Sequence, residues 1–452
     1  MQKTVYDILI ISSMPPSHSA GIGNAHIRAL KEAGHNVDYM TTFDYPDKEE
    51  NIITLLPEPN HSKPSKVRKY VILPIRKVLL YTNVYSLVKR IKDRIAKRLS
   101  NRINTKNLMF LYPDESNPPI QPAIIVQNIK KKYDAVITGF WEGLLNTTSL
   151  AAIYEHLHCP IIIPSPDMAP ITGGCYYFGE CRNFHNGCGK CPLLKSSETC
   201  DQSRKNFELK RQNYSKINCA FLGNTWMRKH AEESKLFSNI FHLEVMIDPI
   251  VFSPSDMNAA RTELGLGNND RFMILIASSF QPRKGIKDIV YAVERFINNT
   301  LPDKNPAVEF IVIGDSYFTS LTKNLKIKTH YLGTVNTSQL VNCYRAANLF
   351  ISASNDDAGP SMINQSLMCG TPVVCYDNGT ALDVVVNNVS GHKSAPGDKD
   401  GLAQGIVEIL SLSSEKYNEM RKASHDMAMR HNSPEVCVRS RIAAIETLKK
   451  LE

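Results

Sequence analysis

The sequence predicts an α/β protein built from two Rossmann-like domains that face each other across a cleft. Short apolar runs, typical of strands buried in parallel sheets, alternate with helical patterns. This alternation occurs in two series, separated by a Pro-containing link at residues 252–254. At 452 residues the chain is also too long for one ordinary core. Open sheets of this class bind ligands at the carboxyl ends of their strands, so the cleft is the expected site.

The first series of strands and helices predicts an N-terminal domain at residues 1–252. The first apolar run contains Asp7 and ends at Met-Pro-Pro, which favours a strand over a signal peptide. It leads into a glycine-bearing turn and a helix that stops at Gly34, the usual end of a β-turn-α unit. The expected strands of this domain are residues 7–13, 35–42, 134–139 and 160–164.

The second series predicts a C-terminal domain at residues 253–430. Its expected strands are residues 272–278, 308–313, 348–352 and 372–376. The remaining residues, 431–452, carry a helical pattern after Pro434. We expect this terminal helix to cross back and pack on the first domain.

Composition and charge exclude a membrane-spanning chain and single out one basic stretch. The sequence has ordinary globular composition, with 42% apolar and 21% charged residues, and it contains no apolar run long enough to span a bilayer. Residues 61–106 hold fourteen Lys and Arg against the single acid Asp93, so this insert carries a charge of +13. The net charge of the whole chain is +9, so the remainder is about −4. An amphipathic helix on an anionic membrane and a solvated helical face both fit this insert. We expect a cytoplasmic protein, which is peripheral at the inner face of the membrane if the insert forms an amphipathic helix on the membrane.

A glycine-bearing turn that starts at Asp357 follows the expected strand at 348–352 and opens a helix. Amides at a helix N-terminus attract phosphate or sugar oxygens, and glycine lets a ligand approach the backbone. The segment 357–374, DAGPSMINQSLMCGTPVV, resembles the donor-site signature of retaining GT-B glycosyltransferases of family 4, the glycogen-synthase-like group. The resemblance implies that Asp357 and the turn hold the donor sugar; the turn consists of Gly359, Pro360, Ser361 and Met362.

The same family places a second acid eight positions after the first, where it binds the ribose of the nucleotide. This sequence has Gln365 at that position. An amide still hydrogen-bonds ribose hydroxyls, so the resemblance retains a weaker ribose role for Gln365.

A basic loop follows the first strand of the second domain. The segment 278–285, SSFQPRKG, resembles the family segment whose basic residues neutralise the donor diphosphate. Lys284 matches the family lysine, whereas the position of the family arginine is taken by Ser279. We expect Arg283 to compensate.

Two further glycine-containing loops resemble family segments, the first near the donor phosphates and the second near the donor phosphates or the acceptor. Gly379 and Thr380 lie in the loop after the last expected core strand. Gly21 and Gly23 lie in the first turn of the chain, although a G-x-G alone fits a plain strand-helix turn equally well.

A cysteine-rich loop at residues 167–200 is the second strong feature. It contains Cys175, Cys181, Cys188 and Cys191, which end in a C-x2-C pair. Four thiolates with this spacing in a Gly-rich loop are typical of structural zinc. An iron–sulfur cluster and a set of free thiols remain alternatives, and His185 could replace one ligand.

The start of this loop resembles a subset of the family from bacterial exopolysaccharide assembly, of the colanic-acid type. That subset carries H-D-M-x-P-x-T-G-G-C, and this sequence has Pro166 in place of the histidine. Asp167 is retained, and we expect it to be an acceptor-side or structural acid. Trp141 and Glu142 are a second acceptor-side candidate, although a tryptophan in a loop more often packs.

Together these features predict a retaining glycosyltransferase that needs no catalytic metal, with Asp357, Lys284 and Asp167 as catalytic residues. The expected partners are a nucleotide-sugar donor and a glycan or lipid-linked acceptor in surface-polysaccharide assembly. One alternative is another GT-B nucleotide-sugar enzyme of the epimerase type. A second alternative is a zinc-bearing nucleic-acid-binding protein, but residues 61–106 lack any nucleic-acid-binding pattern and the donor motif would stay unexplained, so no nucleic-acid partner is expected.

Overall fold

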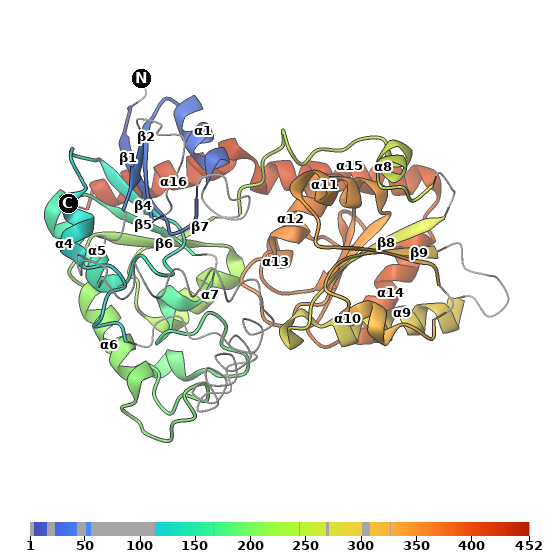
Figure 1. Cartoon of the computed structure of the whole chain (residues 1–452), viewed down its shortest axis with the longest axis horizontal. Coiled ribbons are helices and arrows are strands. Elements are labelled where there is room, and N and C mark those ends of the chain that lie inside the picture. Colours follow the sequence, from blue (N-terminus) through green and yellow to red (C-terminus); the bar gives the residue numbers. More distant parts are fainter. Residues whose placement is uncertain are drawn as a thin grey trace, which may run out of the picture.

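The computed structural model describes two α/β units (Figure 1). The chain passes between them twice, in the link after His242 and in the two C-terminal helices. The described residues are 4–15, 23–42, 51–55 and 114–451, apart from 166, 244, 268–270, 301–307 and 326. The basic insert at 61–106, Gly21 and Pro166 therefore lie outside the described residues.

The first unit is a seven-stranded parallel sheet in the order β3-β2-β1-β4-β5-β6-β7. Its inner strands consist of buried apolar residues, as expected for strands covered on both faces. The strands are β1 (Asp7–Ile11), β2 (Asn36–Thr41), β3 (Ile52–Thr54), β4 (Ala135–Thr138), β5 (Ile161–Pro164), β6 (Cys219–Gly223) and β7 (Ile240–His242). The helices are α1 (Asn24–Glu32), α4 (Pro122–Gln127), α5 (Thr147–Leu157), α6 (Gln202–Tyr214) and α7 (Thr225–Ser234), with short 3-10 turns η2 (Ala169–Ile171) and η3 (Asn183–Asn186).

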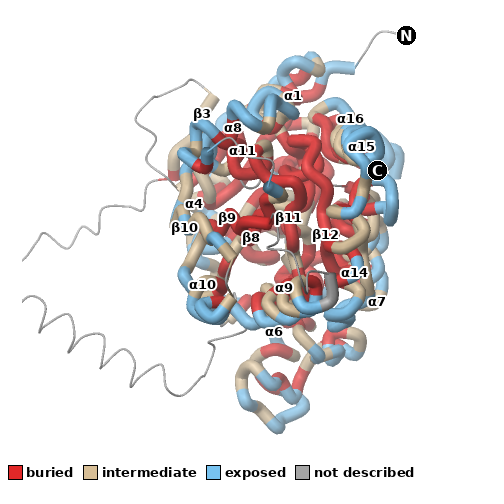
Figure 2. Tube along the Cα trace, turned by 90° about the vertical axis from the view of Figure 1, so that its right-hand side faces the viewer, coloured by how far each residue is buried: buried red, intermediate tan, exposed pale blue. Residues whose placement is uncertain are grey.

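The second unit is a six-stranded parallel sheet in the order β10-β9-β8-β11-β12-β13. The strands are β8 (Phe272–Ser278), β9 (Val308–Gly314), β10 (Thr329–Gly333), β11 (Leu349–Ser352), β12 (Val373–Tyr376) and β13 (Gly391–Ser394). The helices are α8 (Met257–Glu263), α9 (Ile286–Thr300), α10 (Tyr317–Leu321), α11 (Thr337–Ala346), α12 (Ser361–Met368), α13 (Ala381–Val384), α14 (Lys399–Leu410) and α15 (Ser414–Asn432), and η4 (Pro282–Lys284) precedes α9. Figure 2 shows β8, β9, β11 and β12 buried, with more exposed helices around them.

The strand order of the second sheet predicts where a ligand binds. The chain starts at β8, builds outward to β10 and then returns to β11 on the other side of β8. The loops after β8 and β11 therefore diverge at a topological switch point, which is the usual ligand crevice of such sheets. The predicted fold class, two Rossmann-like α/β domains, is confirmed.

The last helix, α16 (Pro434–Lys449), lies against the first sheet and α1 (Figure 1). Its apolar face joins the core of that sheet through Cys437, Val438, Ala444, Ile445 and Leu448. Where the chain crosses back, Asn432 bonds the strand-to-helix link at two points: its Nδ2 donates to the Val245 carbonyl at 2.8 Å, and its carbonyl accepts from the Ile247 amide at 2.9 Å. Among the helices of the described residues, none combines the length and apolar character needed to cross a bilayer.

Candidate active site

The loop after β8 is held in a shape that projects Lys284 toward the loop after β11. Asp315, after β9, accepts hydrogen bonds from the Ser278 hydroxyl at 2.9 Å and from the Phe280 amide at 2.5 Å. The loop ends at Gly285, which has φ +64° and lies so close to Ala353 that a Cβ atom would be 1.9 Å from its carbonyl oxygen. Only glycine fits there, and the close approach brings the two loops together.

Lys284, Arg283 and Asp357 meet at this junction. Asp357 Oδ2 lies 2.5 Å from Lys284 Nζ and 3.1 Å from Arg283 Nη1, and Asp357 is only 4% exposed. A buried carboxylate needs such partners, because an unpaired buried charge is costly. The sequence predicted these residues on two loops of one site, and they are in direct contact in the structure.

The turn after Asp357 forms one wall of a cleft. Gly359 N donates to Asp357 Oδ1 at 3.4 Å, Pro360 is the N-cap of α12, and Ser361 starts the helix. These residues and Met362 line the cleft together with Lys284 and Asp357. The first turn of α12 therefore presents the positive end of a helix dipole to the cleft.

The cleft has a volume of about 570 Å³ and lies at the carboxyl ends of β8, β9 and β11. A volume of this size suits a small-molecule ligand. The first domain contributes Phe140, which follows β4, and Tyr177 from the cysteine-rich loop. Neither residue was predicted from the sequence. Ser279, which replaces the family arginine, lines the cleft.

Gln365 does not lie among the residues that line the cleft. It is on α12, is 5% exposed, and its Oε1 accepts a hydrogen bond from the buried Tyr344 hydroxyl at 3.0 Å. Burial raises the pKa of Tyr344 well above its ordinary value, which keeps this hydroxyl a donor. The ribose role of Gln365 stays a prediction.

Gly379 and Thr380 lie behind the Asp357 loop. Gly379 has φ +53°, and a Cβ there would lie 2.4 Å from the Asp357 carbonyl oxygen. Thr380 is buried and donates to Asn364 Oδ1 at 2.9 Å. Gly379 thus packs against Asp357, and Thr380 bonds α12. Direct contact of either residue with a donor stays a prediction. Gly23, the described member of the first G-x-G, is the N-cap residue of α1.

The cysteine-rich loop contacts the loops that follow β8 and β11. The guanidinium of Arg283 lies 3.9 Å from the centre of the Tyr177 ring, and Gly179 N donates to Asp356 Oδ2 at 2.8 Å. Burial raises the pKa of Tyr177, and the neighbouring Asp357 charge raises it further. Burial also raises the pKa of Asp356. The first domain thereby supplies an aromatic contact to Arg283 and a hydrogen bond to Asp356.

The acceptor-side candidates meet in a small hollow of about 20 Å³ beside the cleft. It is lined by Trp141, Glu142, Asp167 and Tyr176, and it shares Phe140 with the larger cleft. Burial raises the pKa of Asp167 to about 6, even though its Oδ1 accepts from the Ala169 amide at 2.8 Å. The Glu142 charge raises this pKa further. A carboxyl group with this pKa gains and loses a proton near neutral pH.

The four predicted metal ligands line a second hollow of about 20 Å³, between the cysteine-rich loop and the start of α6. They are Cys175, Cys181, Cys188 and Cys191. Gly173 N donates to Cys188 Sγ at 3.2 Å, and positive φ angles at Cys188 and Lys190 curl the C-x2-C turn. Burial raises the pKa of both Cys175 and Cys188 to about 12, so these thiols are neutral unless a cation displaces their protons. The four cysteines thus line one hollow, and the structural zinc ion stays a prediction.

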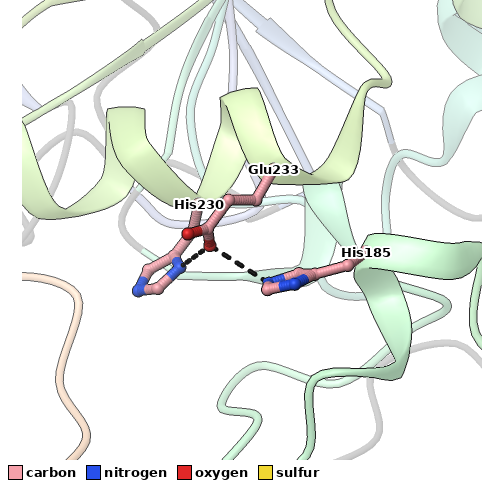
Figure 3. A group of neighbouring side chains, drawn as sticks. All are labelled: His185, His230 and Glu233. Carbon is pink, nitrogen blue, oxygen red and sulfur yellow. Dashed lines mark hydrogen bonds and ion pairs between the residues drawn. The ribbon is translucent and has the colours of Figure 1, made fainter.

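His185 lies with a different group of side chains. Its Nε2 is 3.1 Å from Glu233 Oε2, which also lies 2.7 Å from His230 Nδ1. Figure 3 shows His185 on its 3-10 turn facing the two side chains of α7. Beside them, the Phe178 ring stacks on Trp226 at 5.6 Å. This contact attaches the cysteine-rich loop to α7, and His185 does not join the four cysteines.

Part of the second domain is similar to known proteins. Residues 261–427 match the model of the family described as glycosyl transferases group 1. N-acetyl-alpha-D-glucosaminyl L-malate synthase of Bacillus anthracis is 21% identical over 168 residues, which is 36% of this chain and 42% of that protein. D-inositol 3-phosphate glycosyltransferase of Segniliparus rotundus is 28% identical over 155 residues, or 32% of this chain and 33% of that protein. The chain thus covers less than half the length of these relatives.

Solved structures match nearly the whole chain. Sucrose-phosphate synthase from Thermosynechococcus elongatus aligns with a TM-score of 0.62 at 15% identity, over 99% of this chain and 100% of that one. The Anabaena protein HepE, solved with UDP and glucose, aligns with a TM-score of 0.59 at 16% identity, over 98% and 100% of the chains. At these identities the likeness establishes the GT-B fold alone. The family match therefore applies to residues 261–427, which lie within the second domain.

Proposed function

We propose that the protein is a glycosyltransferase that moves a sugar from a nucleotide sugar to a glycan or lipid-linked acceptor, with retention of configuration. The observation that carries the proposal is the convergence of Arg283, Lys284 and Asp357 on one interdomain cleft. This site provides cations for a diphosphate, a carboxylate for sugar hydroxyls and a helix N-terminus between them. The solved neighbour that contains UDP and glucose supports the same class of donor.

In this proposal, Lys284 and Arg283 neutralise the donor diphosphate and stabilise it as the leaving group. As the bond from the anomeric carbon to the diphosphate breaks, a bond to the acceptor oxygen forms and the acceptor loses its proton. Preorganised cations act strongly in such a step because they lie where negative charge develops. Since the chain itself supplies these cations, the proposed reaction needs no catalytic metal. Asp167, in the neighbouring hollow, binds the acceptor hydroxyl or takes its proton.

The test is nucleotide release from a panel of UDP-, GDP- and ADP-sugars by the full chain. We expect release with one nucleotide class, undiminished by EDTA, and a loss of at least about a hundredfold in Lys284→Ala. Lys287→Ala is the matched control, because Lys287 is an exposed residue at the start of α9 that does not line the cleft. NMR of the product reports whether the anomeric configuration is retained. Failure to bind any of the donors would refute the proposal.

We also propose that the four cysteines hold a structural zinc ion. Metal analysis of protein purified without added metal should give about one zinc per chain, falling to zero in Cys188→Ser. Cys200→Ser is the matched control, because Cys200 is exposed in the same loop and does not line the hollow. Iron in place of zinc, or four titratable thiols without metal, would contradict the proposal.

A role in surface-polysaccharide assembly at the inner face of the membrane is the remaining part of the proposal. It is supported by the +13 charge of residues 61–106 and by the resemblance of the cysteine-rich loop to exopolysaccharide enzymes. We expect binding to anionic vesicles that weakens with salt and is lost when residues 61–106 are deleted. Equal binding to neutral vesicles would argue against it.

A further inference from the structure

A buried arginine from the terminal helix lines a cavity beside the donor cleft. The cavity has a volume of about 90 Å³, and its walls come mostly from apolar residues at the carboxyl ends of the first sheet. Arg441 of α16 lines it although its own exposure is only 3%. A guanidinium cannot shed its charge at neutral pH, so its burial demands polar partners.

The partners of Arg441 within the described residues leave one edge of the guanidinium open. Nη1 donates to the Cys437 carbonyl, one turn earlier in α16, at 2.9 Å. Nε is fully buried and has no hydrogen-bond partner in the described part of the chain. The Nε–Nη2 edge is the one that grips a carboxylate or phosphate with two parallel hydrogen bonds.

His26 of α1 provides a second polar atom in the same cavity. It is 4% exposed, and within the described chain its Nδ1 has no partner. Burial and the charge of Arg441 hold the pKa of His26 well below its ordinary value. A neutral imidazole can donate to an oxyanion or accept from a protonated one, and it does not add a second buried cation.

We propose that Arg441 and His26 form a subsite for an oxyanion of phosphate size, carried by the acceptor. A cavity of about 10–15 Å³ already holds one water by this measure, so 90 Å³ accommodates a phosphate group. Gly359 is a shared wall of this cavity and the donor cleft, and Phe140 is shared with both the cleft and the Asp167 hollow. An anion at Arg441 therefore lies next to the place where donor and acceptor meet.

The cavity belongs mainly to the first domain, which is why the anion is assigned to the acceptor. Apart from Ala358 and Gly359, its lining residues come from the first domain, the link after β7 and α16. The assignment to the acceptor rests on the proposed function. The anion site itself rests only on the cavity and its two unpartnered atoms.

The first experiment measures the melting temperature of the full chain in sodium phosphate and in sodium chloride of matched ionic strength. We expect phosphate to stabilise the wild type, and Arg441→Met to weaken phosphate affinity at least tenfold. In chloride, Arg441→Met should melt at or above the wild-type temperature, because it removes an uncompensated buried charge while keeping the apolar stem. The matched control is Arg439→Gln, an exposed arginine of the same helix.

The donor cleft also attracts phosphate, so Lys284→Ala is tested in parallel. A phosphate response that survives Lys284→Ala and is lost in Arg441→Met or His26→Leu supports the subsite. Loss in Lys284→Ala alone would place the anion in the donor cleft and overturn the proposal. A variant Arg441→Met that melts far below the wild type, with no phosphate response in the wild type, would make Arg441 a structural residue and also overturn it.

The second experiment assigns the anion to the acceptor and separates phosphate from carboxylate. Acceptor glycans that carry a phosphate, a uronic-acid carboxylate or no charge are compared with the donor that the panel identifies. We expect Arg441→Met to raise the KM of the phosphate-bearing acceptor at least tenfold and to leave the KM of the donor unchanged. Preference for the carboxylate glycan, or an equal effect on the uncharged one, would refute the assignment. If no donor is used at all, the proposed function fails, whereas the melting experiment still decides the anion site.

Discussion

Replacing Tyr177 with alanine tests whether the first domain positions a donor-binding cation. The Tyr177 ring lies 3.9 Å from the Arg283 guanidinium, whose side chain is 17% exposed. A cation–π contact contributes about 0.5–1 kcal/mol when exposed and about 2 kcal/mol when desolvated. For a mostly buried guanidinium we expect about 1–2 kcal/mol, which corresponds to a loss of about 5- to 30-fold in donor affinity.

The assay is calorimetric titration of the nucleotide diphosphate into wild type, Tyr177→Ala and Tyr177→Phe. Phenylalanine keeps the aromatic face, so its affinity should stay within about twofold of wild type. A double-mutant cycle with Arg283→Met should show that the two substitutions are not additive, because they remove one contact. Equal losses in Tyr177→Ala and Tyr177→Phe, or additive effects with Arg283→Met, would refute this account of Arg283.

Three further predictions follow from the same geometry. Gly285→Ala combines a left-handed backbone with a Cβ placed 1.9 Å from the Ala353 carbonyl oxygen. We therefore expect this variant to melt several degrees lower and to bind the donor more than tenfold more weakly. Wild-type melting and donor binding in Gly285→Ala would show that the two loops need not approach so closely. Burial raises the pKa of Asp167 to about 6 in the folded protein, so its ionisation disfavours folding increasingly as the pH rises from about 4 to 6. In melting curves measured at several pH values, Asp167→Asn should therefore stabilise the protein at pH 8 and have little effect at pH 4. Acceptor kcat/KM should rise as pH passes through about 6 in the wild type, and a pH profile unchanged by Asp167→Asn would exclude Asp167 as the titrating group.

The sequence predicted most of the buried strands from their local pattern, although it missed the buried strand β6. The apolar run at 272–278 became β8 with only its first and sixth residues less than fully buried, as a strand covered on both faces requires. Strand β10 was missed because its residues are half-exposed or exposed and its alternation is weak. Strand β3 has only three residues, all partly exposed, and leaves almost no periodic signal.

The candidate site was predictable where it depends on the strand ends. Lys284 and Asp357 follow adjacent strands of a parallel sheet, so their meeting follows from the topology. The contacts that depend on distant partners were not predictable. Nothing in the pattern of α12 indicates that the Tyr344 hydroxyl of α11 donates a hydrogen bond to Gln365 Oε1. Nothing in the pattern of α16 indicates that Arg441 faces a cavity rather than solvent.

In the cysteine-rich loop, only a few residues along the chain separate the proposed metal ligands from the residues that contact the proposed donor site. Tyr177 lies two residues after Cys175, and Gly179, two residues further on, bonds Asp356 beside Asp357. Phe178 and Phe184 anchor the loop in the core of the first domain, and we expect the proposed metal to fix the segment between Cys175 and Gly179 by holding the four sulfurs together. Loss of the metal should therefore weaken donor binding in the wild type by about the amount that Tyr177→Ala does, and should have little further effect in Tyr177→Ala itself. Undiminished donor binding by metal-free protein that is still folded would instead show that the His185–Glu233–His230 contact with α7 holds the loop unaided.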